Sequence, residues 1–100
     1  MKTNEKNYVI VRADRAGVFF GNLVNKEGSE VTLNECRKLF YWDGAAAVEQ
    51  IALDGILEGE VKKCKFTVTV ENATILGAIQ IIPCTDKAIK SIKSVPVWRY

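Results

Sequence analysis

The chain has 100 residues, of which 48% are hydrophobic and 26% are charged, and its net charge is +2. These values are typical of one globular domain with its own core, and they argue against a disordered chain. The longest apolar stretches are far shorter than the ~20 residues of a membrane-spanning helix, and the polar start does not resemble a signal peptide. We expect a flexible N-terminus over residues 1–6, a single domain over residues 7–100, no membrane association and a cytoplasmic location.

The sequence contains no histidine, and its three cysteines are Cys36, Cys64 and Cys84. The cysteines are widely spaced and form no CxxC pair, so we expect free buried thiols and no zinc site. The lack of histidine excludes histidine-based triads and HExxH metalloprotease sites. We therefore predict no metal, no cofactor and no enzymatic activity. An enzyme acting through Asp43 or Asp86 would need an added metal and more clustered carboxylates.

Strand-forming residues dominate the first third of the chain. Residues 8–14 and 17–24 are β-branched and apolar, and the short connection between them predicts a hairpin. Residues 25–30 contain the asparagine and glycine of a turn. A short strand then resumes over residues 30–33, and the polar residues 34–35 interrupt it.

The next segment alternates and then changes character. Side chains from residue 37 to residue 42 occupy two strand faces that are both largely apolar, which suggests a strand covered on two sides. Arg37, Leu39 and Tyr41 share one face, and Lys38, Phe40 and Trp42 share the other. Asp43 then caps a predicted helix that runs to about Asp54, and Gly55 is its natural end.

The second half repeats the order of strands followed by a helix. Residues 56–63 are polar and predict a loop. Residues 64–70 and 73–82 have strand character, and we expect them to pair as a hairpin through Glu71 and Asn72, with Pro83 ending the second strand.

A short second helix follows, with Thr85 or Asp86 as its cap and Pro96 as the end of any continuation. Its expected inward-facing residues are Ala88, Ile89 and Ile92. The order of elements predicts an α+β fold, in which a mainly antiparallel curved sheet or partial barrel of about five or six strands carries two short helices.

Five segments, YVIVR, AGVFFG, LFYWDGAA, IIPCT and VPVW, resemble a family of small proteins of unknown function that tailed bacteriophages and prophages encode. The resemblance extends from about Tyr8 to Trp98, and YWDGAA and IIPCT are its motifs. It brings no catalytic residues with it. It implies a phage accessory protein that acts in the cytoplasm of an infected bacterial host cell.

The YWDGAA motif is the first candidate site. If a helix begins there, its leading backbone N–H groups lack partners and attract anions. Gly44 and Ala45 would let a phosphate approach the backbone, Tyr41 or Trp42 would stack on a base, and Arg37 or Lys38 would supply positive charge. The alternative is structural, with Asp43 as a simple cap and the aromatic rings in the core. The Asp43 carboxylate itself argues against an anion there.

A second candidate site is the start of the second helix, where Thr85 caps and Lys87 adds positive charge; an ordinary cap with an exposed lysine is the alternative. Arg12 and Arg15 flank the first turn of the chain. Together with Arg37 they would line a pocket for an anionic ligand if the sheet curls. The plainer explanation is that they are ordinary surface arginines.

Our leading functional hypothesis is an anti-defence protein that binds and sequesters a small anionic nucleotide, an immune signal, at the interface of a homo-oligomer. The predicted ligand-binding residues are Arg12, Arg15, Arg37, Tyr41, Trp42, Gly44, Thr85 and Lys87.

Two alternatives involve macromolecular partners. The first is an adaptor that binds a host or phage protein through a sheet edge or through its aromatic tail, where Trp98 and Tyr100 either pack back on the body or dock on a neighbouring subunit. The second, weaker alternative is nucleic-acid binding through the C-terminal lysines Lys87, Lys90 and Lys93.

Overall fold

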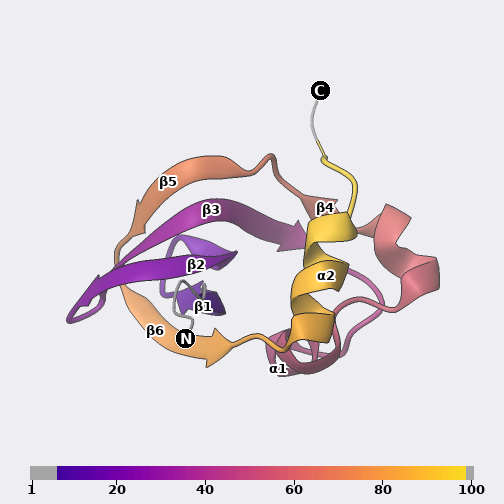
Figure 1. Ribbon diagram of the computed structural model, residues 1–100, viewed down its shortest axis with the longest axis horizontal. Helices are drawn as coiled ribbons and strands as arrows, with labels where there is room; N and C mark the ends of the chain where they lie inside the picture. Colours follow the sequence, from indigo (N-terminus) through magenta and orange to yellow (C-terminus); the bar gives the residue numbers. More distant parts are fainter. Residues whose placement is uncertain (1–6, 99–100) are drawn as a thin grey trace, which may run out of the picture.

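A computed structural model describes residues 7–98 of the chain, so the predictions for residues 1–6 and for Tyr100 lie outside the described residues. Its elements in chain order are β1 (Tyr8–Ala13), β2 (Gly17–Glu27), β3 (Glu30–Tyr41), α1 (Val48–Asp54), the 3-10 helix η1 (Glu58–Lys63), β4 (Lys65–Phe66), β5 (Val70–Ile75), β6 (Ala78–Pro83) and α2 (Asp86–Ser94) (Figure 1). Within residues 7–98, no helix has the length and apolar character needed to span a membrane.

The six strands form one antiparallel sheet in the order β4-β3-β2-β1-β6, and β5 pairs with β3 as well. Strands β4 and β5 lie along successive parts of the same edge of β3. A turn at Leu76 and Gly77 joins β5 to β6, so the chain passes from one side of the sheet to the other and the sheet curls (Figure 1). This arrangement confirms the predicted α+β class and the mainly antiparallel curved sheet.

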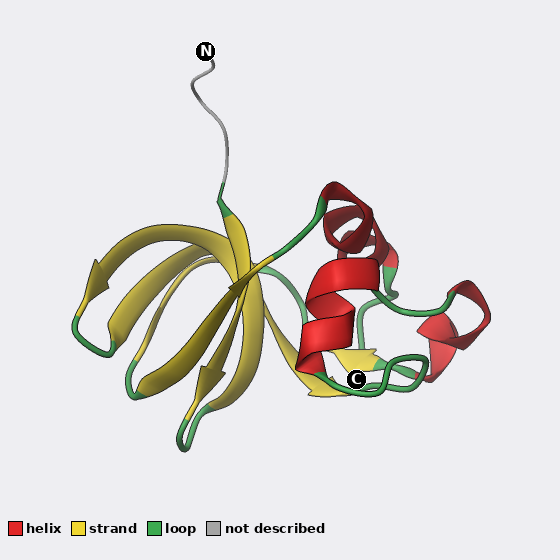
Figure 2. Cartoon of the chain, turned by 90° about the horizontal axis from the view of Figure 1, so that it is seen from below, coloured by secondary structure: helices red, strands yellow, loops and turns green. Residues whose placement is uncertain are grey.

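The sheet has two buried faces, and each has its own core. One face packs against the helices, which gather at one end of the sheet (Figure 2); Tyr8, Ile10, Phe20, Leu39 and Phe66 contribute to that core from the strands. The other face, which we call the inner face, curls around its own side chains. Its core residues are Val9, Val11, Ala13, Val31, Leu33, Cys36 and Ile75.

Strand β3 contains a β-bulge that exchanges its two faces. Phe20 pairs with Arg37 whereas Asn22 pairs with Asn34, so β3 carries one more residue than β2 across this interval. Glu35 lies in the bulge with a φ of 52°, the only positive φ among the described non-glycine residues. Odd-numbered residues face inward before the bulge and even-numbered residues do so after it. The predicted interruption of the strand at residues 34–35 is therefore wrong, because the strand continues through a bulge.

The predicted hairpin through Glu71 and Asn72 is also wrong. Both residues lie inside β5, where Asn72 pairs with Asn34 across the β3 ladder and its side-chain amide donates to the Asn34 side chain (2.8 Å). The chain turns instead at Leu76–Gly77, where Gly77 has a φ of 79°. A glycine adopts this conformation without the steric penalty of a side chain, so it divides what we predicted as one strand over residues 73–82.

The first helix begins later than predicted, and Asp43 does not cap it. Helix α1 starts at Val48, and its N-cap residue is Ala47, which makes no side-chain capping bond. Gly44, with a φ of 89°, turns the chain before the helix, and its carbonyl accepts a hydrogen bond from Leu57 N–H (3.1 Å). The cap prediction failed because this turn separates Asp43 from the helix. The predicted end at Gly55 is confirmed.

Thr85 caps α2, so of the two predicted caps, Thr85 and Asp86, the structure selects the first. Its Oγ1 accepts a hydrogen bond from the Ala88 N–H (3.1 Å) and donates one to the Leu53 carbonyl (2.6 Å), which lies at the end of α1. Ala88 and Ile92 are buried and Ile89 packs against the same core, so the predicted inward face is confirmed. A single hydroxyl thereby joins the two helices.

Replacing Thr85 by alanine is expected to lower the free energy of unfolding by about 0.5–2 kcal/mol, since the first turn of α2 loses its cap. Urea denaturation followed by circular dichroism measures the change. Thr85→Ser is the matched control, because it keeps the oxygen and should retain most of the stability. A Thr85→Ala protein as stable as the parent would contradict the capping role.

Candidate functional site

The structure places the predicted ligand-binding residues in several separate regions. Arg37 is buried, with 4% of its surface exposed. Its Nε donates to the Thr67 carbonyl (2.9 Å), its Nη1 donates to the carbonyls of Ile92 (2.9 Å) and Val95 (3.0 Å), and its Nη2 donates to the Phe66 carbonyl (3.4 Å). Burial lowers the pKa of the guanidinium. Because its donors are directed at backbone carbonyls, we leave Arg37 out of the proposed site.

The other two arginines lie apart. Arg12 is exposed on the helix-facing side of β1, where it donates to the Gln80 side chain (2.8 Å). Gln80 in turn donates to Glu49 (3.1 Å), and that hydrogen bond is the main reason why the pKa of Glu49 is lowered. Arg15 is exposed in the turn between β1 and β2 and lines a surface hollow there. Arg12 therefore belongs to a chain of hydrogen-bonded side chains on one face of the sheet, whereas Arg15 borders the surface hollow.

Gly44 and Lys87 both line a cavity of about 760 Å³ between α1, η1 and α2. Lys87 lies 3.8 Å from the Asp54 carboxylate, which also lines this cavity. Glu58 and Lys90 add one charge of each sign. The cavity is therefore balanced in charge, and it does not have the positive character that an anionic ligand requires. Thr85 serves as the α2 cap, so its hydroxyl is already engaged.

The predicted aromatic residues separate into a core residue and a surface residue. Trp42 packs against the core between sheet and helices. Tyr41 is 47% exposed and lies beside three further residues that our site prediction did not include. Phe40 and Trp98 stack with ring centroids 5.0 Å apart and planes inclined by 13°, and Lys65 Nζ lies 5.4 Å from the Trp98 ring centroid and 6.0 Å from that of Tyr41. We call Phe40, Tyr41, Lys65 and Trp98 the aromatic–lysine patch.

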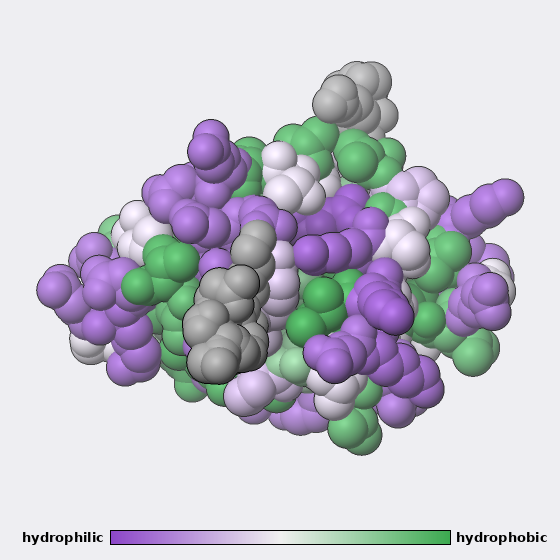
Figure 3. All heavy atoms as spheres, viewed as in Figure 1, coloured by the Kyte–Doolittle hydropathy of each residue, from purple (hydrophilic) through white to green (hydrophobic). Residues whose placement is uncertain are grey.

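Three elements assemble this patch. Phe40 and Tyr41 end β3, and Lys65 pairs with Tyr41 from β4. Trp98 is held by its backbone N–H, which donates to the Phe66 carbonyl (2.9 Å), next to a parallel bridge between Phe66 and Val97. Trp98 thus packs back on the body of its own chain, the first of our two expectations for the tail. The space-filling view shows apolar side chains gathered beside the C-terminal end of the chain (Figure 3).

The rings of the patch remain open to solvent, with 56% of Phe40 and 44% of Trp98 exposed. Lys65 forms no ion pair with any residue in the range 7–98. On the Tyr41 side the hydroxyl donates to the Asp43 carboxylate (3.3 Å). Positive charge therefore predominates at the Trp98 side, and the Asp43 carboxylate adds negative charge at the Tyr41 side.

The cysteine thiols are free. Burial raises the pKa of Cys36 to about 11 and that of Cys84 to about 12, and it also raises the pKa of Cys64. At neutral pH these groups stay protonated and are therefore weak nucleophiles. In the described part of the chain, no three His, Cys, Asp or Glu side chains cluster closely enough to hold a metal ion.

Sequence reasoning identified the FYW segment but did not identify the patch. That segment contains Phe40 and Tyr41, and Trp98 belongs to an aromatic tail, but no sequence pattern points to Lys65. The sequence signal for the patch is the apolar tail after Pro96, because an aromatic residue in such a tail needs a surface to pack on.

We compared the chain with known proteins and families. No curated protein and no solved structure matches it. A family model described as a domain of unknown function, DUF6948, matches residues 6–92, well over half of the chain. The chain therefore belongs to the DUF6948 family.

Proposed function

We propose that this protein acts by binding a nucleotide at the aromatic–lysine patch. A base stacks on the exposed Trp98 and Phe40 rings, and the Lys65 ammonium attracts the phosphate. The resemblance to phage-encoded proteins suggests the setting, in which sequestering a nucleotide signal of host immunity is the proposed role. This role requires binding and release but no chemistry on the ligand.

One observation carries the proposal, namely a stacked pair of rings that are each about half exposed, with a lysine beside them. Stacking between a base and an aromatic ring contributes about 1–3 kcal/mol in proteins that bind single-stranded nucleic acid. Lys65 Nζ lies over the Trp98 ring, 5.4 Å from its centroid, so the patch that offers the stacking rings also offers a positive charge for the phosphate. The surface thus combines both elements of nucleotide recognition, a π face and a cation.

The patch is open on its outer side, which bears on the proposed homo-oligomer. A base on Trp98 would be covered on one face only, and a second copy of the chain could cover the other face. We therefore propose that tight sequestration involves two copies. Analytical ultracentrifugation with and without ligand tests this part separately from binding.

Replacing Trp98 by alanine is expected to weaken nucleotide binding by about 1–3 kcal/mol, because the base loses its stacking surface. Isothermal titration calorimetry with adenosine monophosphate and a panel of cyclic nucleotides measures the affinity. Leu53→Ala is the matched control, since Leu53 is also an exposed apolar residue (60%) but lies in α1.

Two results would contradict the proposal. One is a parent protein that binds no member of the panel, and the other is a Trp98→Ala protein that binds as well as the parent. Tryptophan fluorescence adds an independent signal. Trp98 is exposed and should respond to a stacked base, whereas Trp42 packs against the core and should not.

An adaptor role is the second candidate, and the free edge of the sheet supports it. Among the described strands, β6 pairs only with β1, and its Ile79 is 61% exposed. An extended segment of a host or phage protein could add to this edge as a further strand. Cross-linking of a captured partner to β6, with no nucleotide bound by the parent protein, would favour this role over the first.

A further inference from the structure

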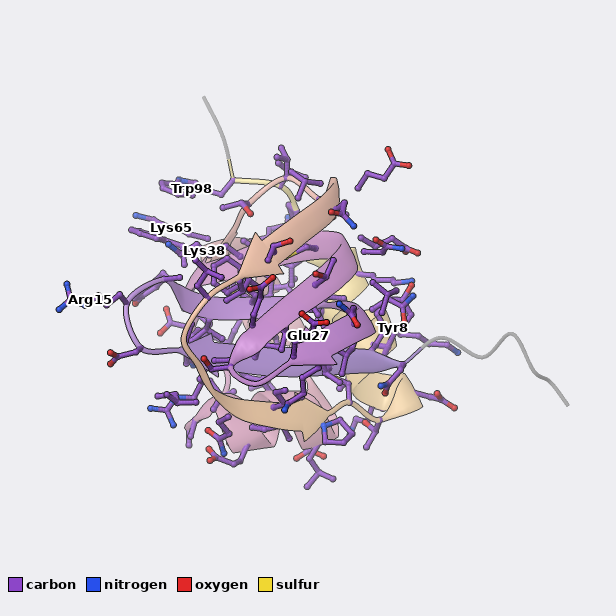
Figure 4. All side chains as sticks on the ribbon, turned by 90° about the vertical axis from the view of Figure 1, so that its left-hand side faces the viewer. Tyr8, Arg15, Glu27, Lys38, Lys65 and Trp98 are labelled. Carbon is purple, nitrogen blue, oxygen red and sulfur yellow. The ribbon has the colours of Figure 1, made fainter. Side chains whose placement is uncertain are left out.

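We infer that the ligand of the aromatic–lysine patch contains at least two nucleotide units, and that the second unit occupies a hollow beside Arg15 and Lys38. This inference rests on the proposed function and extends it from a mononucleotide to an oligonucleotide. A second aromatic ring, Phe19, lies beside a cation, Lys38, on the same side of the molecule (Figure 4).

The hollow lies between the β1–β2 turn and the β5–β6 turn and has a volume of about 620 Å³. Phe19 and Leu76 give it apolar walls, Arg15 and Thr74 add polar groups, and Asp14 is the acidic residue that lines it. The Arg15 guanidinium and the Asp14 carboxylate balance each other at the border of the hollow, so the positive charge for a phosphate comes from Lys38 beside Phe19, and the apolar walls suit a flat, partly apolar group.

Lys38 joins this hollow to the patch. Its Nζ lies 5.8 Å from the centroid of the Phe19 ring, and Phe19 also lines the hollow. Phe19 and Lys38 are partners in the β2–β3 ladder, so their side chains stand on the same face of the sheet. The side chain of Lys38 crosses Gly17, where an added Cβ would approach its Cε to 3.0 Å. The glycine thus leaves space for the lysine to lie over the strand.

The bulge in β3 is what aligns the two subsites. After Glu35, Lys38 and Phe40 lie on the same face, two residues apart, which corresponds to about 6.6 Å along a strand. Lys38 therefore lies next to the patch along β3 and next to Phe19 across the ladder. Figure 4 shows Trp98, Lys65, Lys38 and Arg15 along one side of the molecule, with Trp98, Lys65 and Arg15 projecting outward and Tyr8 on the opposite side.

The charges along this side favour a phosphate chain. Arg15, Lys38 and Lys65 form no ion pair with any residue between Asn7 and Trp98. Two of the three α2 lysines that the sequence had suggested for nucleic acid are engaged elsewhere: Lys87 pairs with Asp54 (3.8 Å) and Lys93 donates to the Tyr8 hydroxyl (2.9 Å), whereas Lys90 lines the cavity between the helices. Among the described residues, Arg15, Lys38 and Lys65 form a row of cations leading away from Trp98 (Figure 4).

The inference is tested by comparing ligands of increasing length in the full chain. Adenosine monophosphate, linear diadenylate, a linear oligoadenylate and a cyclic dinucleotide are titrated by calorimetry at several salt concentrations. We expect each ligand with two units to bind about tenfold more tightly than the monophosphate, as for one added hydrogen bond to a charged group. Comparing the affinities of the linear and the cyclic compounds shows whether the site prefers two units of a linear oligonucleotide or a cyclic dinucleotide.

Arg15→Gln and Lys38→Gln are expected to remove that tenfold gain and to leave the affinity for the monophosphate unchanged. Each should also reduce the slope of log K against log salt concentration for the oligoadenylate by about 0.7, the value for one phosphate contact on a single strand. Arg12→Gln is the matched control, since Arg12 is an exposed arginine on the opposite face, and it should change neither quantity. Melting temperatures confirm that all three variants fold.

The outcomes separate this inference from the proposed function. If the monophosphate binds and the longer ligands gain nothing, or if Arg15→Gln and Lys38→Gln keep the gain, the two-unit inference is wrong and the proposed function stands. If no nucleotide binds the parent protein, both are wrong. A gain that disappears in Arg15→Gln and Lys38→Gln and persists in Arg12→Gln supports the inference.

Discussion

Replacing Arg37 by alanine is expected to lower the free energy of unfolding by about 3–5 kcal/mol. The guanidinium makes four hydrogen bonds to backbone carbonyls of the segment around Phe66 and of the end of α2. Its carbon also lies 5.4 Å from the centroid of the Phe66 ring. Without it, these buried carbonyls lose their donors and a cavity remains. Small domains are stable by about 5–15 kcal/mol, so this loss would be a large fraction of the total stability.

Two controls make the Arg37 prediction specific. Arg37→Lys keeps the charge and much of the volume but has one nitrogen in place of the planar fork, so its stability should lie between those of Arg37→Ala and the parent. Arg12→Ala removes an exposed arginine and should cost less than about 1 kcal/mol. Guanidinium chloride denaturation measures all three. Equal stability of Arg37→Ala and Arg12→Ala would show that the buried guanidinium does not hold β4 and α2 together.

Gly55→Ala is expected to destabilise the protein by about 2–5 kcal/mol, from the sum of backbone strain and overpacking. Gly55 ends α1 with a φ of 77°, a conformation that costs side-chain-bearing residues energy. An added Cβ would also overlap the Cβ and Oγ of Ser91 in α2. Ser91 Oγ accepts a hydrogen bond from the Ile56 N–H (2.8 Å). The methyl group would therefore push the two helices apart and strain this bond.

The variant Gly28→Ala separates the cost of backbone strain from the cost of overpacking. Gly28 also has a positive φ (62°), but an added Cβ there would meet no atom within 4 Å. Its replacement should cost only the backbone term, about 1–2 kcal/mol. Thermal unfolding measures the stability lost in each variant. The difference between the two losses is the contribution of the contact between α1 and α2. A Gly55→Ala protein no less stable than Gly28→Ala would refute the close approach of α1 and α2.

Local sequence patterns predicted the elements whose contacts are local. The hairpin of β1 and β2 follows from two β-branched runs joined by a short turn, and the limits of α2 follow from Thr85 and Pro96. The bulge in β3 could not be predicted, because it depends on the partner strand. Gly21 of β2 lacks a Cβ, and an added one would come within 3.0 Å of the Asn34 carbonyl. Only the paired strands reveal that this glycine provides space for an extra residue.

The candidate site was harder to predict than the fold. Alternation correctly placed Arg37 and Leu39 on the same face, and that face is buried. Arginine is rarely buried, so a surface role was the natural expectation for Arg37. The aromatic–lysine patch joins Phe40, Lys65 and Trp98, which are far apart in the sequence. Their contact follows from the pairing of β3 with β4 and the return of the tail, which no local pattern encodes.

The central position of β1 has a consequence for synthesis of the chain. Strand β1 is the first to leave the ribosome, yet it lies between β2 and β6, and Val9 pairs with Pro83. Its second edge therefore stays unpaired until β6 has emerged. The carbonyls that accept from Arg37 come later still, at Ile92 and Val95. Domains dominated by such non-local pairings fold slowly, so we expect the domain to complete its fold only after Val95 has left the ribosome.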